Sequence, residues 1–135
     1  MQTQKAEPGL GELAQFRFEV RRFLSFSEAR AKAAGLTAQQ YQLLQVVELG
    51  GDAGQSISAL AERLLLRHNS AVELVDRAER VGLVVRFADT TDLRRSLVRL
   101  TPAGREILNT LVEEHLAYLR TAGAEMLKAL RPMVC

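Results

Sequence analysis

The sequence predicts a mainly α-helical fold with a small β-hairpin, that is, an α+β protein. Stretches that begin near residues 9, 37, 59 and 102 carry apolar residues at the three- and four-residue spacing of helices with a buried face. Two β-rich segments, 83–87 and 96–100, lie between the helical stretches that begin near residues 59 and 102, and a polar loop joins them. A length of 135 residues with 47% apolar residues suits one globular domain with helical extensions.

Composition excludes several classes of protein. The single cysteine, Cys135, excludes an intramolecular disulfide and a cysteine-based metal cluster. No apolar run approaches the roughly 20 residues that cross a bilayer, and residues 1–8 show no signal-peptide pattern, so we expect a cytoplasmic protein. The net charge is only +2, with 15 arginines and 3 lysines. Arginine suits phosphate and base contacts, although a high-GC genome also favours it.

The first helix is expected over residues 9–34 and ends at Gly35. Its apolar stripe is Leu13, Phe16, Val20, Phe23 and Leu24, and Phe18 and Phe26 lie off that stripe. The apolar surface is therefore wider than one packing partner needs.

The second helix is expected to begin after Thr37, where Gln40 completes a capping box. Its inner face carries Tyr41, Leu44, Val46 and Val47. The glycine-rich run 50–54 predicts a loop, and Ile57 is expected in a short strand.

Two helices joined by a short turn follow. Ser58 is expected to cap a helix over 59–65, and the turn 66–69 leads into a longer helix that ends near Val81, before Gly82. The buried stripe of the longer helix is Ala71, Leu74, Val75 and Ala78. In DNA-reading helix-turn-helix proteins, the second helix enters the major groove.

The β-hairpin has a loop, 88–94, that is longer than a tight turn and should project as a wing. Asp92 and Arg94 stand two residues apart on an extended segment and therefore share a side. We expect Asp92 to support the loop while Arg94 points outward, which suits a narrow minor groove. Arg86, Arg95 and Arg99 are expected to add positive charge nearby.

The longer helix and the wing together predict a DNA-binding surface. Its members are Arg67, His68, Asn69, Ser70, Glu73, Arg77, Arg94 and Arg95. Asn69 could pair with adenine, Arg77 with guanine or phosphate, and Glu73 with cytosine N4. A solvated helix face and a solubilising loop tip are the alternatives for each part alone, but their adjacency favours DNA.

The last helical region is expected to begin after Thr101 as N-cap, with Pro102 at its first position. Apolar residues over 107–119 cover more than one face. A break is expected at 121–123, followed by a short terminal helix over 126–130.

Three segments resemble the MarR family of winged helix-turn-helix transcription regulators. Residues 56–64 resemble the first helix of its motif, 70–84 its recognition helix and exit, and 92–104 its wing signature and the start of the next helix. The sequence departs from the family at Leu65, where the turn often has glycine, and at Ala78, where a large aliphatic residue is usual.

The resemblance implies a homodimeric regulator, usually a repressor, that a small and often aromatic ligand releases from a near-palindromic operator. It places the winged helix-turn-helix in 36–101 and the dimerisation helices in 9–35 and 102–131. The surplus apolar residues of the outer helices agree with a covered interface. The expected interface residues are Phe16, Val20, Phe23, Leu111, Tyr118, Leu119 and Leu127.

The sequence contains no enzyme signature, and we expect neither a cofactor nor a metal. His68 and His115 lie on different helices without a cysteine or carboxylate at ligand spacing. His115 is expected either to be satisfied at an interface or to touch a ligand. Cys135 is expected to be a plain terminal thiol, with an intersubunit disulfide as the alternative.

A protein-interaction module that keeps the winged-helix fold without DNA binding is the alternative function. Glu73, Asp76, Asp89 and Asp92 dilute the positive surface and keep this alternative open.

Overall fold

The computed structural model describes residues 9–134 of the chain. Its elements are α1 (Leu10–Ala33), α2 (Ala38–Glu48), the 3-10 helix η1 (Gly51–Ala53), β1 (Gln55–Ser56), α3 (Ile57–Leu64), α4 (His68–Arg80), β2 (Val84–Ala88), β3 (Ser96–Leu100) and α5 (Pro102–Val134). The predicted mainly α-helical fold with a small sheet is confirmed. None of the helices within 9–134 combines the length and apolar character needed to cross a membrane.

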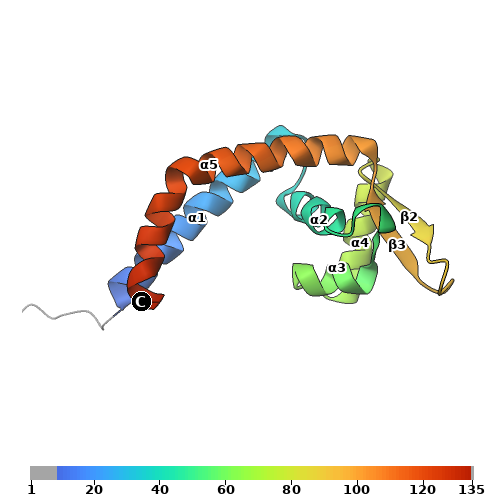
Figure 1. Ribbon diagram of the computed structural model, residues 1–135, viewed down its shortest axis with the longest axis horizontal. Coiled ribbons are helices and arrows are strands. Elements are labelled where there is room, and N and C mark those ends of the chain that lie inside the picture. The colour runs from blue at the N-terminus through green and yellow to red at the C-terminus, as the bar shows by residue number, and fades with distance from the viewer. Residues whose placement is uncertain (1–8, 135) are drawn as a thin grey trace, which may run out of the picture.

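The molecule has two parts, which Figure 1 shows at opposite ends of the view. The lobe comprises α2 to β3, with the start of α5 lying against it. The arm comprises α1 and the part of α5 that runs beside it, away from the lobe. Because α5 belongs to both parts, it connects them as one helix.

The buried core lies in the lobe and under the first half of α5. Its largest fully buried side chains are Leu43, Leu44, Val47, Leu60, Val75, Val84, Val98 and Leu111. Each such side chain contributes about 1.5–3 kcal/mol when it leaves water. The predicted inner stripe of α4 is buried throughout, so this core fixes α4 against α2, α3 and the sheet.

The sheet is antiparallel, and its strand order is β1-β3-β2. Strand β3 matches its prediction, and β2 begins one residue later than predicted. Residue Val84 lies opposite Leu100 and Ala88 opposite Ser96, so the loop between them spans 89–95 and projects from the sheet as the wing.

The predicted starts of α2 and α5 are confirmed by their capping hydrogen bonds. The Oγ1 atom of Thr37 accepts from the Gln40 amide at 3.1 Å, and the Thr37 amide donates to the Gln40 side chain at 3.0 Å. Thr101 Oγ1 accepts from the Gly104 amide at 3.0 Å, and Pro102 is the first residue of α5.

The predicted start of α3 was wrong by two residues. Ser56, not Ser58, caps the helix and accepts from the Ala59 amide at 3.2 Å. Ile57 is the first helical residue rather than a strand residue. The pairing of Ser56 with Leu97 on β3 fixes where the strand ends, and the helix begins immediately afterwards.

The predicted break at 121–123 was also wrong. Helix α5 continues through these residues to Val134, and it bends visibly along its course in Figure 1. Packing along α1 continues as far as Ala129, which is buried. This packing outweighs the cost of about 1 kcal/mol that Gly123 imposes in a helix interior.

Candidate nucleic-acid interface

Helix α4 presents one exposed polar face to solvent. Arg67 is its N-cap residue, and Asn69, Ser70, Glu73 and Arg77 are exposed along it. His68, the first residue of the helix, is exposed as well. The four buried residues of the opposite stripe hold this face outward, so all six predicted α4 site residues lie on an accessible surface.

The turn between α3 and α4 contains an unusual backbone conformation. Leu65 has a φ of 56°, and within residues 9–134 it is the one residue other than glycine with positive φ. Its side chain is 92% exposed, so no packing compensates for the strain. The turn forms without the glycine that is common there, and the amide of Leu66 donates to the carbonyl oxygen of Ala61 at 2.9 Å.

The wing loop is shaped by two aspartates. Asp92 Oδ1 accepts from the Arg94 amide at 3.1 Å and from Arg94 Nε at 3.2 Å. Asp89 Oδ1 accepts from the Thr91 amide at 2.9 Å and from Thr91 Oγ1 at 2.7 Å. These hydrogen bonds from Thr91 lower the pKa of Asp89. The Arg94 side chain remains 92% exposed, so the loop displays it while fixing its base.

Arg86 does not add free positive charge, contrary to the expectation from sequence. Its guanidinium forms an ion pair with Asp76 of α4 and lies 3.8 Å from Glu79 Oε1. Its amide also donates to Glu79 Oε2 at 3.1 Å. Arg99 stacks on Phe87, with its guanidinium carbon 4.7 Å from the ring centroid. Asp76 is therefore paired within the lobe, and Arg94, Arg95 and Arg99 are the exposed arginines of the wing and its strands.

Two hollows flank the exposed face of α4 and contain residues that the sequence did not single out. One is lined by Ser56, Ser58 and Ser96 together with His68, Arg94 and Arg95. The other places Gln39 of α2 beside Ser70, Glu73 and Arg77. Nothing local in the sequence links Gln39 or Ser58 to this surface, since both are brought there by tertiary packing.

The arm exposes many apolar side chains. Leu10, Leu13, Phe18 and Leu24 on α1, and Leu116, Leu127 and Val134 on α5, are each about half exposed or more. The predicted interface residues Phe16, Val20, Phe23, Tyr118 and Leu119 are half-buried. Leu111 differs from them because it is only 1% exposed and belongs to the core of the single chain. Its place in a dimer interface was therefore predicted wrongly.

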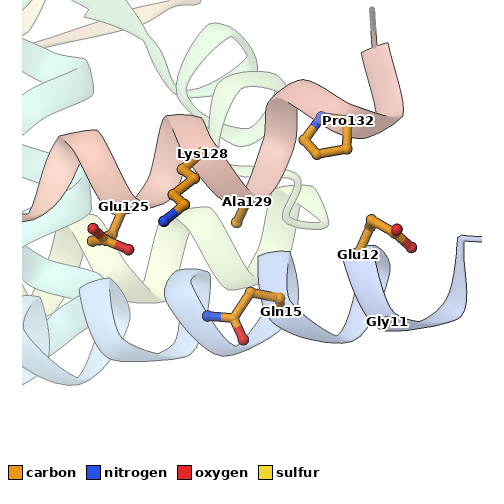
Figure 2. A pocket seen from close by; sticks show the side chains of 7 residues that line it. All are labelled: Gly11, Glu12, Gln15, Glu125, Lys128, Ala129 and Pro132. Carbon is orange, nitrogen blue, oxygen red and sulfur yellow. The ribbon is translucent and has the colours of Figure 1, made fainter.

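The end of the arm contains a hollow of about 380 Å³ between the start of α1 and the end of α5. Figure 2 shows Lys128 of α5 pointing toward α1 across this hollow, whereas the Gln15 side chain runs along α1 and donates to Glu19 Oε1 at 3.3 Å. The hollow is open to solvent between the two helices, although Ala129, which lines it, is buried. Cys135 lies outside the described residues.

His115 lies in a buried aromatic cluster where α1, α2 and α5 meet. Its ring stacks on Tyr41 at 4.6 Å between centroids and meets Phe26 edge-on at 5.3 Å. Its Nδ1 lies 2.6 Å from the Leu111 carbonyl oxygen and its Nε2 lies 2.8 Å from Ser27 Oγ. Since a carbonyl can only accept, Nδ1 carries a proton and donates. Burial raises the pKa of Tyr41.

Neither histidine has the surroundings of a metal site. Within 9–134, no three His, Cys, Asp or Glu side chains gather closely enough to hold a metal ion. Both ring nitrogens of His115 have protein partners.

Comparison with known proteins places these features in a family. The model of the MarR family matches residues 34–95. Over 92 residues the chain is 34% identical to a protein of Thauera aromatica described as a transcriptional regulatory protein for the hcr operon, covering 68% of this chain and 54% of that protein. The chain spans about half the length of the curated relatives it matches.

Solved structures share the fold over most of the chain. The S. aureus MepR–DNA complex superposes with a TM-score of 0.67 at 20% identity, covering 88% of this chain and 93% of MepR. NadR in complex with 4-hydroxyphenylacetate superposes with a TM-score of 0.69 at 24% identity, covering 99% and 94% of the two chains. By its match to the family model over residues 34–95 and its 34% identity to the Thauera aromatica protein over 68% of the chain, the chain belongs to the MarR family.

Proposed function

We propose that this protein is a sequence-specific DNA-binding transcriptional regulator that acts as a homodimer. The observation that carries the proposal is the adjacency of two surfaces. The outer face of α4 exposes side chains able to read bases, and the wing beside it displays Arg94. The Arg86–Asp76 ion pair links the two surfaces, so they would meet DNA as one unit.

Each exposed side chain has a contact that suits its chemistry. Asn69 can pair with adenine, Arg77 with guanine or a phosphate, and Glu73 with cytosine N4. Ser70 can donate to a base or a phosphate. Arg94 suits a narrow minor groove, where the negative potential is strongest. We assign Arg67, His68 and Arg95 to the backbone.

We propose that residues 9–35 and 102–131, without Leu111, form the homodimer interface. An arm with this many exposed apolar side chains would normally be covered by a partner. A second copy related by a two-fold axis would cover the same residues on both chains. Two recognition helices would then lie about one turn of DNA apart on a near-palindromic operator.

We propose that the regulator is a repressor and that a small aromatic ligand releases it from DNA. The cluster around His115 supports this, since its aromatic rings and polar ring nitrogens lie where the arm meets the lobe. The fold is shared with NadR, whose structure contains 4-hydroxyphenylacetate. A phenolic ligand would stack on the rings of this cluster, and its hydroxyl would take the place of one partner in the hydrogen bond between Ser27 and His115.

The proposal is tested by fluorescence anisotropy on DNA duplexes with three variants. Arg94→Ala should weaken binding on all sequences and lower the salt dependence by about one unit of slope. Asn69→Ala should relax specificity at one base pair, at a cost of about 1–3 kcal/mol on the preferred site. Gln45→Ala, an exposed change on α2 outside the proposed dimer interface and away from the exposed face of α4, should alter neither. If Arg94→Ala and Asn69→Ala both bind like the wild type, the assigned surface is wrong.

A further inference from the structure

A hollow of about 520 Å³ lies between the start of α3, the start of α4 and the end of the wing loop. Its polar lining consists of Arg94, Arg95, His68 and three serines, of which Ser58 is exposed at the second position of α3. None of the described residues that line it is acidic. The chemistry of this lining suits a phosphate, because every polar group in it can donate a hydrogen bond.

Both arginines are held at one end and free at the other. Arg94 is anchored through Nε by Asp92 at 3.2 Å, and Arg95 Nε lies 3.8 Å from Asp89 Oδ2. Both of these contacts use Nε, and no partner within residues 9–134 contacts Nη1 or Nη2 of either arginine. The Arg94 and Arg95 side chains are 92% and 54% exposed. The wing therefore positions two guanidinium groups at the hollow and leaves their outer N–H groups for an anion.

We propose that this hollow seats one phosphate of the DNA backbone, held by Arg95, His68 and Ser58. The inference rests on the proposed function and deepens it. In B-DNA a sugar–phosphate strand separates the major groove from the adjacent minor groove. If α4 enters the major groove and Arg94 the minor groove, that strand must cross between them. The hollow lies at this crossing, between His68 of α4 and the arginines of the wing.

Because this hollow is open to solvent, it suits a phosphate of the DNA backbone better than a free phosphate ion. Its lining residues are exposed or half-buried, so a small anion would remain hydrated and would be held weakly. A phosphate within a duplex is delivered by the neighbouring contacts of α4 and the wing, which removes most of the cost of association.

The experiment introduces a negative charge at Ser58 without disturbing the fold. Acidic residues in the first turn of a helix are favourable, so Ser58→Glu should fold at least as well as the wild type. Ser58→Gln supplies the same bulk without charge. Gln45→Glu is the charge-matched control, since Gln45 is exposed on α2, outside the proposed dimer interface and DNA-binding surface, and gives the same change in net charge.

Affinity is measured on a duplex of mixed sequence, because a phosphate contact does not depend on base sequence. Ser58→Glu should weaken binding by roughly tenfold or more, whereas Ser58→Gln and Gln45→Glu should change affinity by no more than about threefold. Arg95→Gln should lower the slope of log affinity against log salt by about 0.9, the value for one phosphate. Equal effects of Ser58→Glu and Gln45→Glu on affinity, or an unchanged salt slope in Arg95→Gln, would contradict the proposed phosphate site.

A second measurement separates the two sources of phosphate. Thermal unfolding is followed in inorganic phosphate and in chloride of equal ionic strength, without DNA. A phosphate-specific stabilisation lost in Ser58→Glu, with DNA affinity retained by that variant, assigns the hollow to a free phosphate and overturns the proposal. If the wild type binds no duplex at low salt, the proposed function itself fails, and that outcome is distinct from failure of the seat.

Discussion

Arg86 of β2 forms an ion pair with Asp76 of α4, which ties the first strand of the wing to the side of α4 that faces the sheet. The same residue donates its amide to Glu79 Oε2 at 3.1 Å, so two carboxylates one turn apart hold one arginine. The contact fixes the angle between α4 and the wing. It also removes Asp76 from the accessible negative charge of the surface.

A double-mutant cycle measures this contact. Arg86→Ala and Asp76→Ala should each destabilise the fold, and the coupling free energy between them should be about 0.5–1 kcal/mol, because both side chains keep some contact with water. Chemical denaturation of the four proteins provides the values. A control cycle between Arg86 and Glu73, which lies on the exposed face, should show coupling near zero. Additive effects of Arg86 and Asp76 would refute the contact.

Because Leu65 has a positive φ, we expect its replacement by glycine to stabilise the fold. An L-residue in the left-handed region costs about 1–2 kcal/mol, and glycine avoids this cost but loses about 0.5–1 kcal/mol of chain entropy. Since Leu65 is 92% exposed, Leu65→Gly should raise the free energy of unfolding by roughly 0.5–1 kcal/mol. Leu93→Gly is the control, as Leu93 is exposed without positive φ and should gain nothing. A loss of stability in Leu65→Gly would contradict the strained turn.

Replacing Gly104 or Gly123 of α5 by alanine should change the stability of the fold in opposite directions. A Cβ at Gly104 would clash with the backbone oxygen of Leu83, so Gly104→Ala should cost about 1–3 kcal/mol. A Cβ at Gly123 would meet nothing closer than Leu119 Cβ at 4.0 Å, so Gly123→Ala should gain about 0.5–1 kcal/mol. Thermal denaturation distinguishes them. A destabilised Gly123→Ala would mean that α5 is not a regular helix at that point.

The lowered pKa of Asp89 leads us to expect that the wing loses stability in acid. Hydrogen bonds from Thr91 hold the pKa of Asp89 below its ordinary value of 3.8. Because the pKa is lowered in the folded state, the stabilisation is complete above the ordinary value and is lost as pH falls through the lowered one. Thr91→Val removes the hydroxyl donor and should raise the pKa of Asp89 toward 3.8 in an NMR titration. An unchanged pKa in this variant would show that the hydroxyl contributes nothing.

Sequence alone predicted those features whose partners are near in the chain. The capping box joins Thr37 and Gln40 over three residues, and the stripe of α4 repeats at helical spacing, so both were visible as local patterns. The start of α3 was misplaced because Ser56 and Ser58 are equivalent as caps. Pairing of Ser56 with Leu97, forty-one residues away, decides between them.

The candidate site was predicted in outline, and its details depend on tertiary contacts. Arg86 reads as free charge in the sequence, and only the approach of β2 to α4 neutralises it. Gln39 and Ser58 reach the site surface by packing of α2 and α3 against α4, which leaves no local signal. The continuity of α5 through Gly123 likewise depends on packing against α1.

Selection from a pool of random DNA duplexes tests the central claim most directly. The purified protein is bound to the pool at low salt, and the retained duplexes are sequenced. The account predicts enrichment of a near-palindrome whose half-sites are about 10–10.5 base pairs apart from centre to centre, as a two-fold dimer reading through α4 requires. Retention of no duplex at low salt would contradict the account and would favour a protein-interaction module.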